Sequence, residues 1–145
     1  MTLYLILVSG FAATSLMTAF SYMIANLKES QFREPELLNL LLSRARSTNL
    51  KISKNHFLGW IIHYTIGYLF IGVFHLIWKY TALPLSLGSG AALGFVAGIL
   101  GIGGWIVFFK TNSNPPKIEF KDFYLQLLVA HVIFGLTAAA VYLLW

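Results

Sequence analysis

Four long runs of apolar residues, separated by polar stretches and turns, dominate the chain. The runs cover residues 3–26, 57–80, 86–109 and 122–145. With a rise of about 1.5 Å per residue, a helix of about 20 residues crosses the hydrocarbon core of a bilayer. The pattern therefore predicts an all-α integral membrane protein whose four transmembrane helices form one antiparallel bundle. We expect the whole chain, 1–145, to be a single membrane domain.

The polar stretch 27–55 contains a short amphipathic segment, EPELLNLLLSRAR, that begins at Glu34. Pro35 suits the first turn of a helix, where its missing N–H costs no hydrogen bond. Leucines cover one broad side of this helix, which is too short to span a bilayer. We expect an interfacial helix on the cytoplasmic lipid headgroups, and packing on the end of the bundle is the alternative. The basic residues expected near the headgroups are Arg44, Arg46, Lys51 and Lys54.

Lysine and arginine are distributed unequally between the two sides of the expected membrane. The stretches 27–55 and 110–121 carry nine of them, namely Lys28, Arg33, Arg44, Arg46, Lys51, Lys54, Lys110, Lys117 and Lys121. The opposite side carries only Lys79. Cytoplasmic loops of membrane proteins are enriched in these residues. We therefore expect both stretches to be cytoplasmic and both termini to lie outside, in a bacterial inner membrane.

Composition supports a lipid environment and excludes several kinds of chemistry. Hydrophobic residues make up 58% of the chain and charged residues 10%, against roughly 25% charged residues in a typical soluble domain. The net charge of +5 follows the loop pattern, so we expect the lipid bilayer and no nucleic acid as a partner. The chain has no cysteine, which excludes disulfides, thiolate nucleophiles and iron–sulfur clusters.

The third apolar run is rich in glycine. Gly90, Gly94 and Gly98 recur at four-residue spacing, and Gly101 continues the same face. Such a stripe of small residues lets another helix approach closely in a membrane. Together with the small size of the chain, this surface favours a structural or accessory subunit, within a homo-oligomer or a larger membrane complex.

Histidines are the ionisable residues inside the apolar runs that suggest a site. His63 and His131 each precede a glycine by four residues, and lie about 9 Å and 12–14 Å from the cytoplasmic starts of their helices. We expect them to face each other near the bundle axis. His56 belongs to the interface, and His75 lies in the outer half without a histidine at its level.

The spacing His-x-x-x-Gly occurs in the second and fourth runs, and Ser-Gly followed by small residues occurs in the first and third. Two interpretations stay open. The chain is a tandem repeat of a two-helix unit, or the match arises by chance within a small apolar alphabet.

Several roles are compatible with His63 and His131. Both could form interhelical hydrogen bonds, ligate haem b axially, hold zinc or copper with one oxygen ligand, bind a small ligand or relay protons. All five acidic residues lie in the polar stretches or at their borders. We therefore expect no carboxylate beside the histidines. Because a Ser-His-Asp hydrolase needs an acid to orient its histidine, enzymatic activity is not favoured.

Overall fold

The computed structural model describes residues 2–45 and 52–145, and the regular structure in these ranges is entirely helical. The elements are α1 (Thr2–Leu27), α2 (Glu34–Ser43), α3 (Phe57–Tyr80), α4 (Leu87–Thr111) and α5 (Phe120–Leu143). Among the described residues, four helices are long and apolar enough to cross a membrane: α1, α3, α4 and α5. The predicted all-helical class is confirmed, and so is the prediction of four helices of spanning length and composition, whereas their arrangement as an antiparallel transmembrane bundle stays a prediction.

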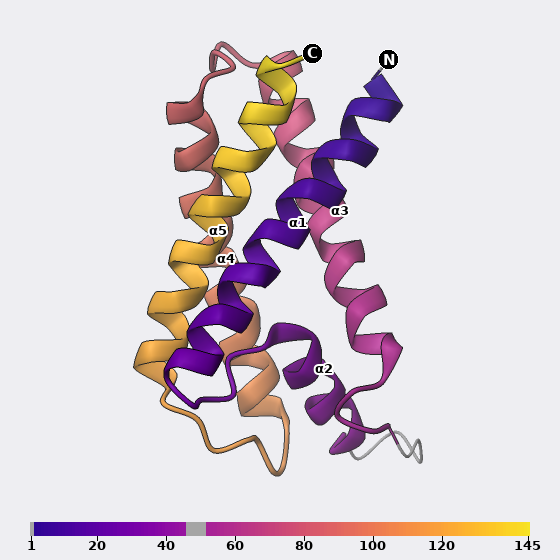
Figure 1. Ribbon diagram of the computed structural model, residues 1–145, viewed down its shortest axis with the longest axis vertical. Coiled ribbons are helices and arrows are strands. Elements are labelled where there is room, and N and C mark those ends of the chain that lie inside the picture. Colours follow the sequence, from indigo (N-terminus) through magenta and orange to yellow (C-terminus); the bar gives the residue numbers. More distant parts are fainter. Residues whose placement is uncertain (1, 46–51) are drawn as a thin grey trace.

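The long helices pack in a defined order. α1 lies against both α3 and α5, α4 lies against α5, and the short α2 lies against α3. Both termini are at one end of the molecule, and α2 and the α4–α5 connection are at the other (Figure 1). The described parts of both polar stretches thus share one end, as the lysine and arginine pattern requires. Which side of a membrane this end faces stays a prediction.

Glycines allow the close contact between α4 and α5. A Cβ atom added at Gly90 would lie 2.5 Å from the carbonyl oxygen of Gly135, and one at Gly94 would lie 3.1 Å from the Gly135 Cα. At Gly98 the added atom would lie 3.2 Å from the Cβ of His131. Larger residues at these positions would separate the two backbones. The glycine stripe of α4 is therefore covered by α5 of the same chain.

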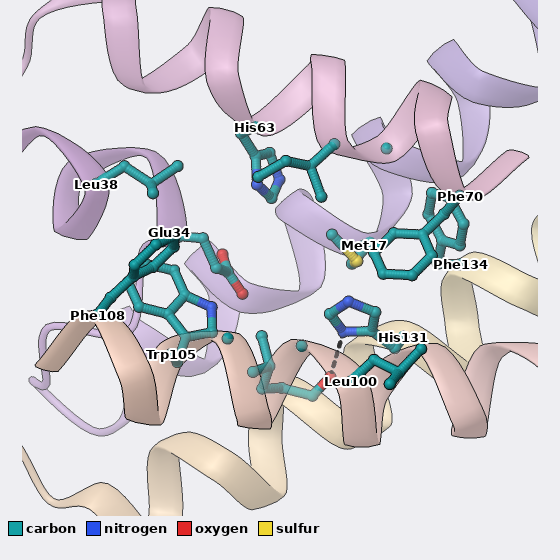
Figure 2. Close-up of a pocket in the computed structure, with 15 residues that line it drawn as sticks. Met17, Glu34, Leu38, His63, Phe70, Leu100, Trp105, Phe108, His131 and Phe134 are labelled. Carbon is teal, nitrogen blue, oxygen red and sulfur yellow. Dashed lines mark hydrogen bonds between the residues drawn. The ribbon is translucent and has the colours of Figure 1, made fainter. Parts of the chain in front are cut away.

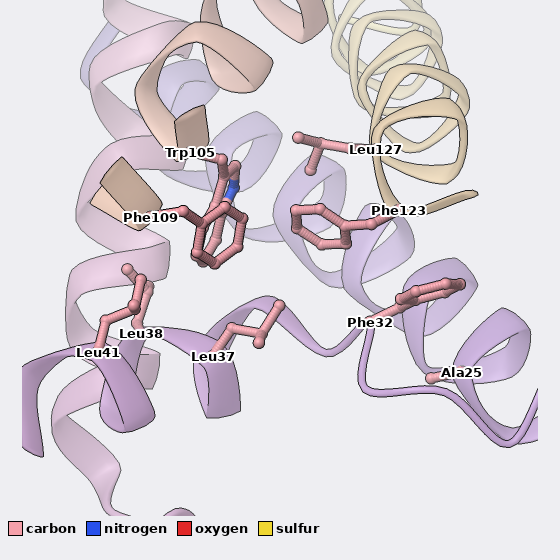
Figure 3. Close-up of a cluster of buried hydrophobic side chains, with 9 residues drawn as sticks. All are labelled: Ala25, Phe32, Leu37, Leu38, Leu41, Trp105, Phe109, Phe123 and Leu127. Carbon is pink, nitrogen blue, oxygen red and sulfur yellow. The ribbon is translucent and has the colours of Figure 1, made fainter. Parts of the chain in front are cut away.

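The leucine face of α2 is turned into the protein, whereas a position of this helix at the lipid headgroups stays a prediction. Its leucines Leu37, Leu38 and Leu41 are buried, and they pack into a cluster with aromatic residues of α4 and α5, including Trp105 and Phe123 (Figure 3). Burial against aromatic side chains removes this apolar surface from any solvent. The helix packs across the ends of the long helices, which corresponds to the alternative that the sequence left open.

A buried asparagine attaches α2 to the start of α3. The Asn39 side chain donates to the carbonyl oxygens of Lys54 and His56, and accepts from the backbone N–H of Gly59 at 2.8 Å. His56 in turn caps α3, because its Nδ1 accepts from the backbone N–H of Leu58. These bonds fix α2 in place.

The basic residues predicted for the headgroups have mixed surroundings. Lys54 pairs with Glu36 at 3.0 Å, and an Arg44 N–H donates to the carbonyl oxygen of Asn114 at 3.1 Å. Arg46 and Lys51 lie outside the described residues. Headgroup binding by these four residues stays a prediction.

Candidate functional site

A cavity of about 220 Å³ lies between α3 and α4, and side chains from all five helices line it. Figure 2 shows His63 and His131 entering it from opposite sides and the carboxyl group of Glu34 pointing towards the space between them. Most other lining residues are apolar, and four are aromatic: Phe70, Trp105, Phe108 and Phe134. The cavity therefore combines an apolar wall with three ionisable groups.

The cavity opens sideways between α3 and α4. Four lining residues are exposed, Gly104 among them; the other three are Ile66 by 37%, Leu100 by 63% and Phe108 by 46% of their surface. Within the described ranges, α3 and α4 do not pack closely against each other, although each packs against another helix. Since both helices are candidate spans, this opening faces hydrocarbon when they cross a bilayer.

His63 is held from the neighbouring helix α1. Its imidazole is buried, with 6% of the residue exposed, and its Nε2 lies 2.8 Å from the hydroxyl oxygen of Thr18. The Thr18 hydroxyl donates to the carbonyl oxygen of Thr14 at 2.6 Å. This chain of bonds fixes the orientation of the ring.

His131 is held by its own helix. Its Nδ1 lies 2.8 Å from the carbonyl oxygen of Leu127, one turn earlier in α5. Phe70 meets the ring edge-on, with centroids 6.0 Å apart. Gly101 leaves room on the α4 side, because a Cβ there would lie 3.2 Å from the His131 Nε2. The glycine stripe thus also shapes one wall of the cavity.

Glu34 is the lining residue that the sequence interpretation missed. It begins α2 and is 1% exposed. Its Oε1 accepts from the Ser21 hydroxyl at 2.6 Å and from the Gln126 amide at 3.4 Å, whereas its Oε2 is buried without a partner. Burial raises the pKa of this carboxyl from 4.5 to about 7, although the hydrogen bonds from Ser21 and Gln126 act in the opposite direction.

Comparisons of the chain with protein-family models, with curated proteins and with solved structures give no match. The functional argument therefore rests on the residues and the geometry of this cavity.

The expectation that no carboxylate lies beside the histidines is wrong, and the reason is helical periodicity. Glu34 precedes Leu37, Leu38 and Leu41 by three, four and seven residues, so it shares their helix face. Burying those leucines against α4 and α5 also buries Glu34. The signal was present in the sequence, but it becomes visible only once α2 packs inward.

The other two histidines lie apart from the cavity. His75 accepts or donates a hydrogen bond of 3.1 Å with the Tyr142 hydroxyl, and His56 caps α3. Neither residue lines the cavity. Of the four histidines, the structure brings together only the two that the spacing had singled out.

Proposed function

We propose that this protein is a small membrane protein that binds a small ligand in the cavity between α3 and α4. One observation carries the proposal. Glu34, His63 and His131, from three different helices, line one mostly apolar cavity. Ionisable groups inside a membrane protein are energetically costly, so their presence there suggests a functional site. Convergent polar groups in an apolar pocket are the usual form of a ligand site.

Cavity size and ligand geometry favour a small organic molecule over haem or a metal ion. The volume of about 220 Å³ is below the roughly 300–1,000 Å³ usual for drug-sized ligands, and a haem macrocycle is larger still. Nearby, a hollow of about 660 Å³ has no histidine in its lining. The described residues contain no group of three or more His, Asp or Glu side chains that could hold a metal ion. A metal ion needs its ligands at about 2 Å, and Glu34, His63 and His131 do not approach one another closely enough for that.

Interhelical hydrogen bonding accounts for one histidine but not for the other. His63 bonds across to Thr18 of α1. The hydrogen bond that holds His131 stays within α5, so this residue joins no helices in that way. Interhelical hydrogen bonding therefore does not explain the polar ring at position 131, whereas contact with a ligand in the cavity does.

The role of an accessory subunit stays a prediction with less support. Its basis was the glycine face of α4, and Gly90, Gly94 and Gly98 lie against α5 of the same chain. Co-purification of a partner from native membranes tests that role.

Native mass spectrometry tests ligand binding. Wild-type protein in lipid nanodiscs is incubated with an extract of small molecules and lipids from cell membranes, and a species of increased mass with one bound molecule is expected. Gly101→Leu fills the cavity beside His131 and should abolish that species. Gly103→Ala is the control, because a Cβ there meets nothing within 4 Å and the residue does not line the cavity. Equal binding by the Gly101→Leu protein would contradict the proposal.

A further inference from the structure

The hydrogen-bond partners of the two cavity histidines determine which nitrogen carries the proton. Neither imidazole bonds to a carboxylate that could offset a buried positive charge, so the neutral form suits both. The Nδ1 of His131 faces a backbone carbonyl oxygen, which only accepts. The proton of neutral His131 therefore sits on Nδ1. Its Nε2 is then a hydrogen-bond acceptor.

The same reasoning applies to His63. The Thr18 hydroxyl hydrogen is donated to the carbonyl oxygen of Thr14, so the Thr18 oxygen can only accept from His63. Neutral His63 therefore carries its proton on Nε2, and its Nδ1 is an acceptor. No described residue donates to either of these free nitrogens.

The third polar group adds further acceptors. Glu34 Oε2 and Gln126 Oε1 are both buried without a hydrogen-bond partner. Two nearby donors are already used. The Ser21 hydroxyl donates to Glu34 Oε1, and the Gln126 amide donates to the Ser21 oxygen and to Glu34 Oε1. Gln126 itself does not line the cavity, so the cavity presents the two histidine acceptors and the Glu34 carboxyl group, with the indole N–H of Trp105 as a donor in its wall. Buried acceptors that stay unsatisfied destabilise the protein.

We propose that the ligand of this cavity is an amphipathic amine, whose protonated nitrogen donates to Glu34, His63 and His131 and whose apolar body extends through the opening between α3 and α4. This inference rests on the proposed function and specifies its ligand class. An ammonium group carries several N–H donors and no acceptor, which matches three acceptors. Its positive charge pairs with the Glu34 carboxylate, so that the buried pair is neutral as a whole.

The walls of the cavity suit the same kind of molecule. Phe70, Trp105, Phe108 and Phe134 supply aromatic faces, and a cation is attracted to the face of an aromatic ring. The exposed apolar edge formed by Ile66 and Leu100 suits the part of the ligand that stays in hydrocarbon. An anion would meet the Glu34 carboxylate, and a ligand with acceptors only would find no matching donors on the histidines.

Three compounds with one carbon skeleton separate the alternatives: 2-phenylethylamine as the cation, 2-phenylethanol as the neutral donor and phenylacetate as the anion. Their binding to wild-type protein in nanodiscs is measured at pH 8 by titration calorimetry. We expect the amine to bind at least about tenfold more tightly than the alcohol, since hydrogen bonds with charged groups are stronger than those between neutral groups. Phenylacetate should not bind.

Two variants show where binding occurs. Glu34→Gln preserves the shape of the side chain and should abolish the preference for the amine while binding of the alcohol is retained. Glu119→Gln, an exposed carboxylate outside the cavity lining, should change nothing. Gly101→Leu should remove binding of every compound.

The outcomes distinguish the two proposals. If the alcohol or the anion binds as tightly as the amine, and Gly101→Leu still abolishes binding, the amine assignment is wrong and the ligand site stands. If none of the three compounds binds to wild-type protein or to the Gly101→Leu protein, both the ligand class and the proposed function are contradicted. Binding of the amine that is unchanged in Glu34→Gln would also overturn the assignment.

Discussion

At the level of single residues, Glu34 has the largest influence on what the cavity can do. A carboxyl with a pKa of about 7 is partly ionised near neutral pH, so the cavity exists in a neutral and an anionic form. Other titratable side chains lie near this group: His63 and His131 line the same cavity, Tyr22 interacts with it electrostatically, and Arg33 and Glu36 are close to it in the chain. A change at position 34 alone is therefore needed to separate its titration from theirs.

The raised pKa predicts that stability decreases as pH rises. The folded protein holds the Glu34 proton more tightly than the unfolded chain, so this contribution is fully present below pH 4.5 and is lost as pH rises through about 7. The loss amounts to at most about 3 kcal/mol in the free energy of unfolding. Glu34→Gln should remove this part of the pH dependence.

Denaturant titrations in detergent between pH 4 and pH 8 measure this effect. The exposed Glu119→Gln variant should follow the wild-type curve. If the Glu34→Gln curve has the same slope with pH as the wild-type curve, the buried position of the carboxyl is contradicted.

Thr18→Val tests the hydrogen bond that orients His63. Valine keeps the shape of threonine but leaves His63 Nε2 without a partner, and we expect a loss of about 1 kcal/mol in the free energy of unfolding. Thr65→Val is the matched control on α3, because Thr65 is exposed and its hydroxyl bonds only to the carbonyl oxygen of Ile61. Equal effects of the two variants would show that the Thr18–His63 bond contributes nothing specific.

Residue spacing predicted part of this site. The His-x-x-x-Gly pattern singled out His63 and His131 because each lies at a similar depth on an apolar helix, and both line the cavity. The sequence could not place Glu34, because the face of α2 that is buried depends on where the whole helix packs. Local periodicity fixes which residues share a face, but the direction of that face is a tertiary property.

At the level of elements, the contact between α4 and α5 determines the shape of the cavity wall. Gly94 packs against the backbone of α5 next to His131 and Gly135. Gly94→Ala should force the helices apart and lower the free energy of unfolding by about 1–3 kcal/mol. Gly103→Ala should be neutral or slightly stabilising, because the added Cβ meets nothing within 4 Å and alanine favours a helix.

Thermal unfolding of the two variants in detergent compares these effects directly. A Gly94→Ala protein as stable as Gly103→Ala would contradict the close α4–α5 contact. The glycine spacing indicated a packing face in advance. It could not indicate whether the partner helix belongs to the same chain or to another one, because both choices satisfy the same requirement for small residues.

At the level of the whole molecule, the connections rich in lysine and arginine lie together at one end (Figure 1). The prediction is that Ser53→Cys and Ser113→Cys, both at exposed positions, react from the cytoplasmic side. Ala82→Cys, in the exposed turn between α3 and α4, should react from the opposite side. Labelling of intact cells with a thiol reagent that does not cross membranes measures this. Reaction of Ser113→Cys from outside would overturn the orientation.

Apolar length and composition were sufficient to predict four spans, because a bilayer imposes both on any helix that crosses it. The cavity could not be predicted in this way. It depends on α3 and α4 remaining apart while α1 and α5 hold them, and no local pattern in the chain encodes that separation.

The central claim is that His63 and His131 belong to one ligand site, and their ring nitrogen NMR signals test it most directly. Protein labelled with ¹⁵N only in histidine, with signals assigned from single His→Gln variants, is titrated with 2-phenylethylamine. The account predicts that the His63 and His131 signals shift together with one binding constant. The His56 and His75 signals, from residues outside the cavity, should stay unchanged. Shifts of His63 and His131 with different binding constants, or equal shifts of all four histidines, would contradict a shared site.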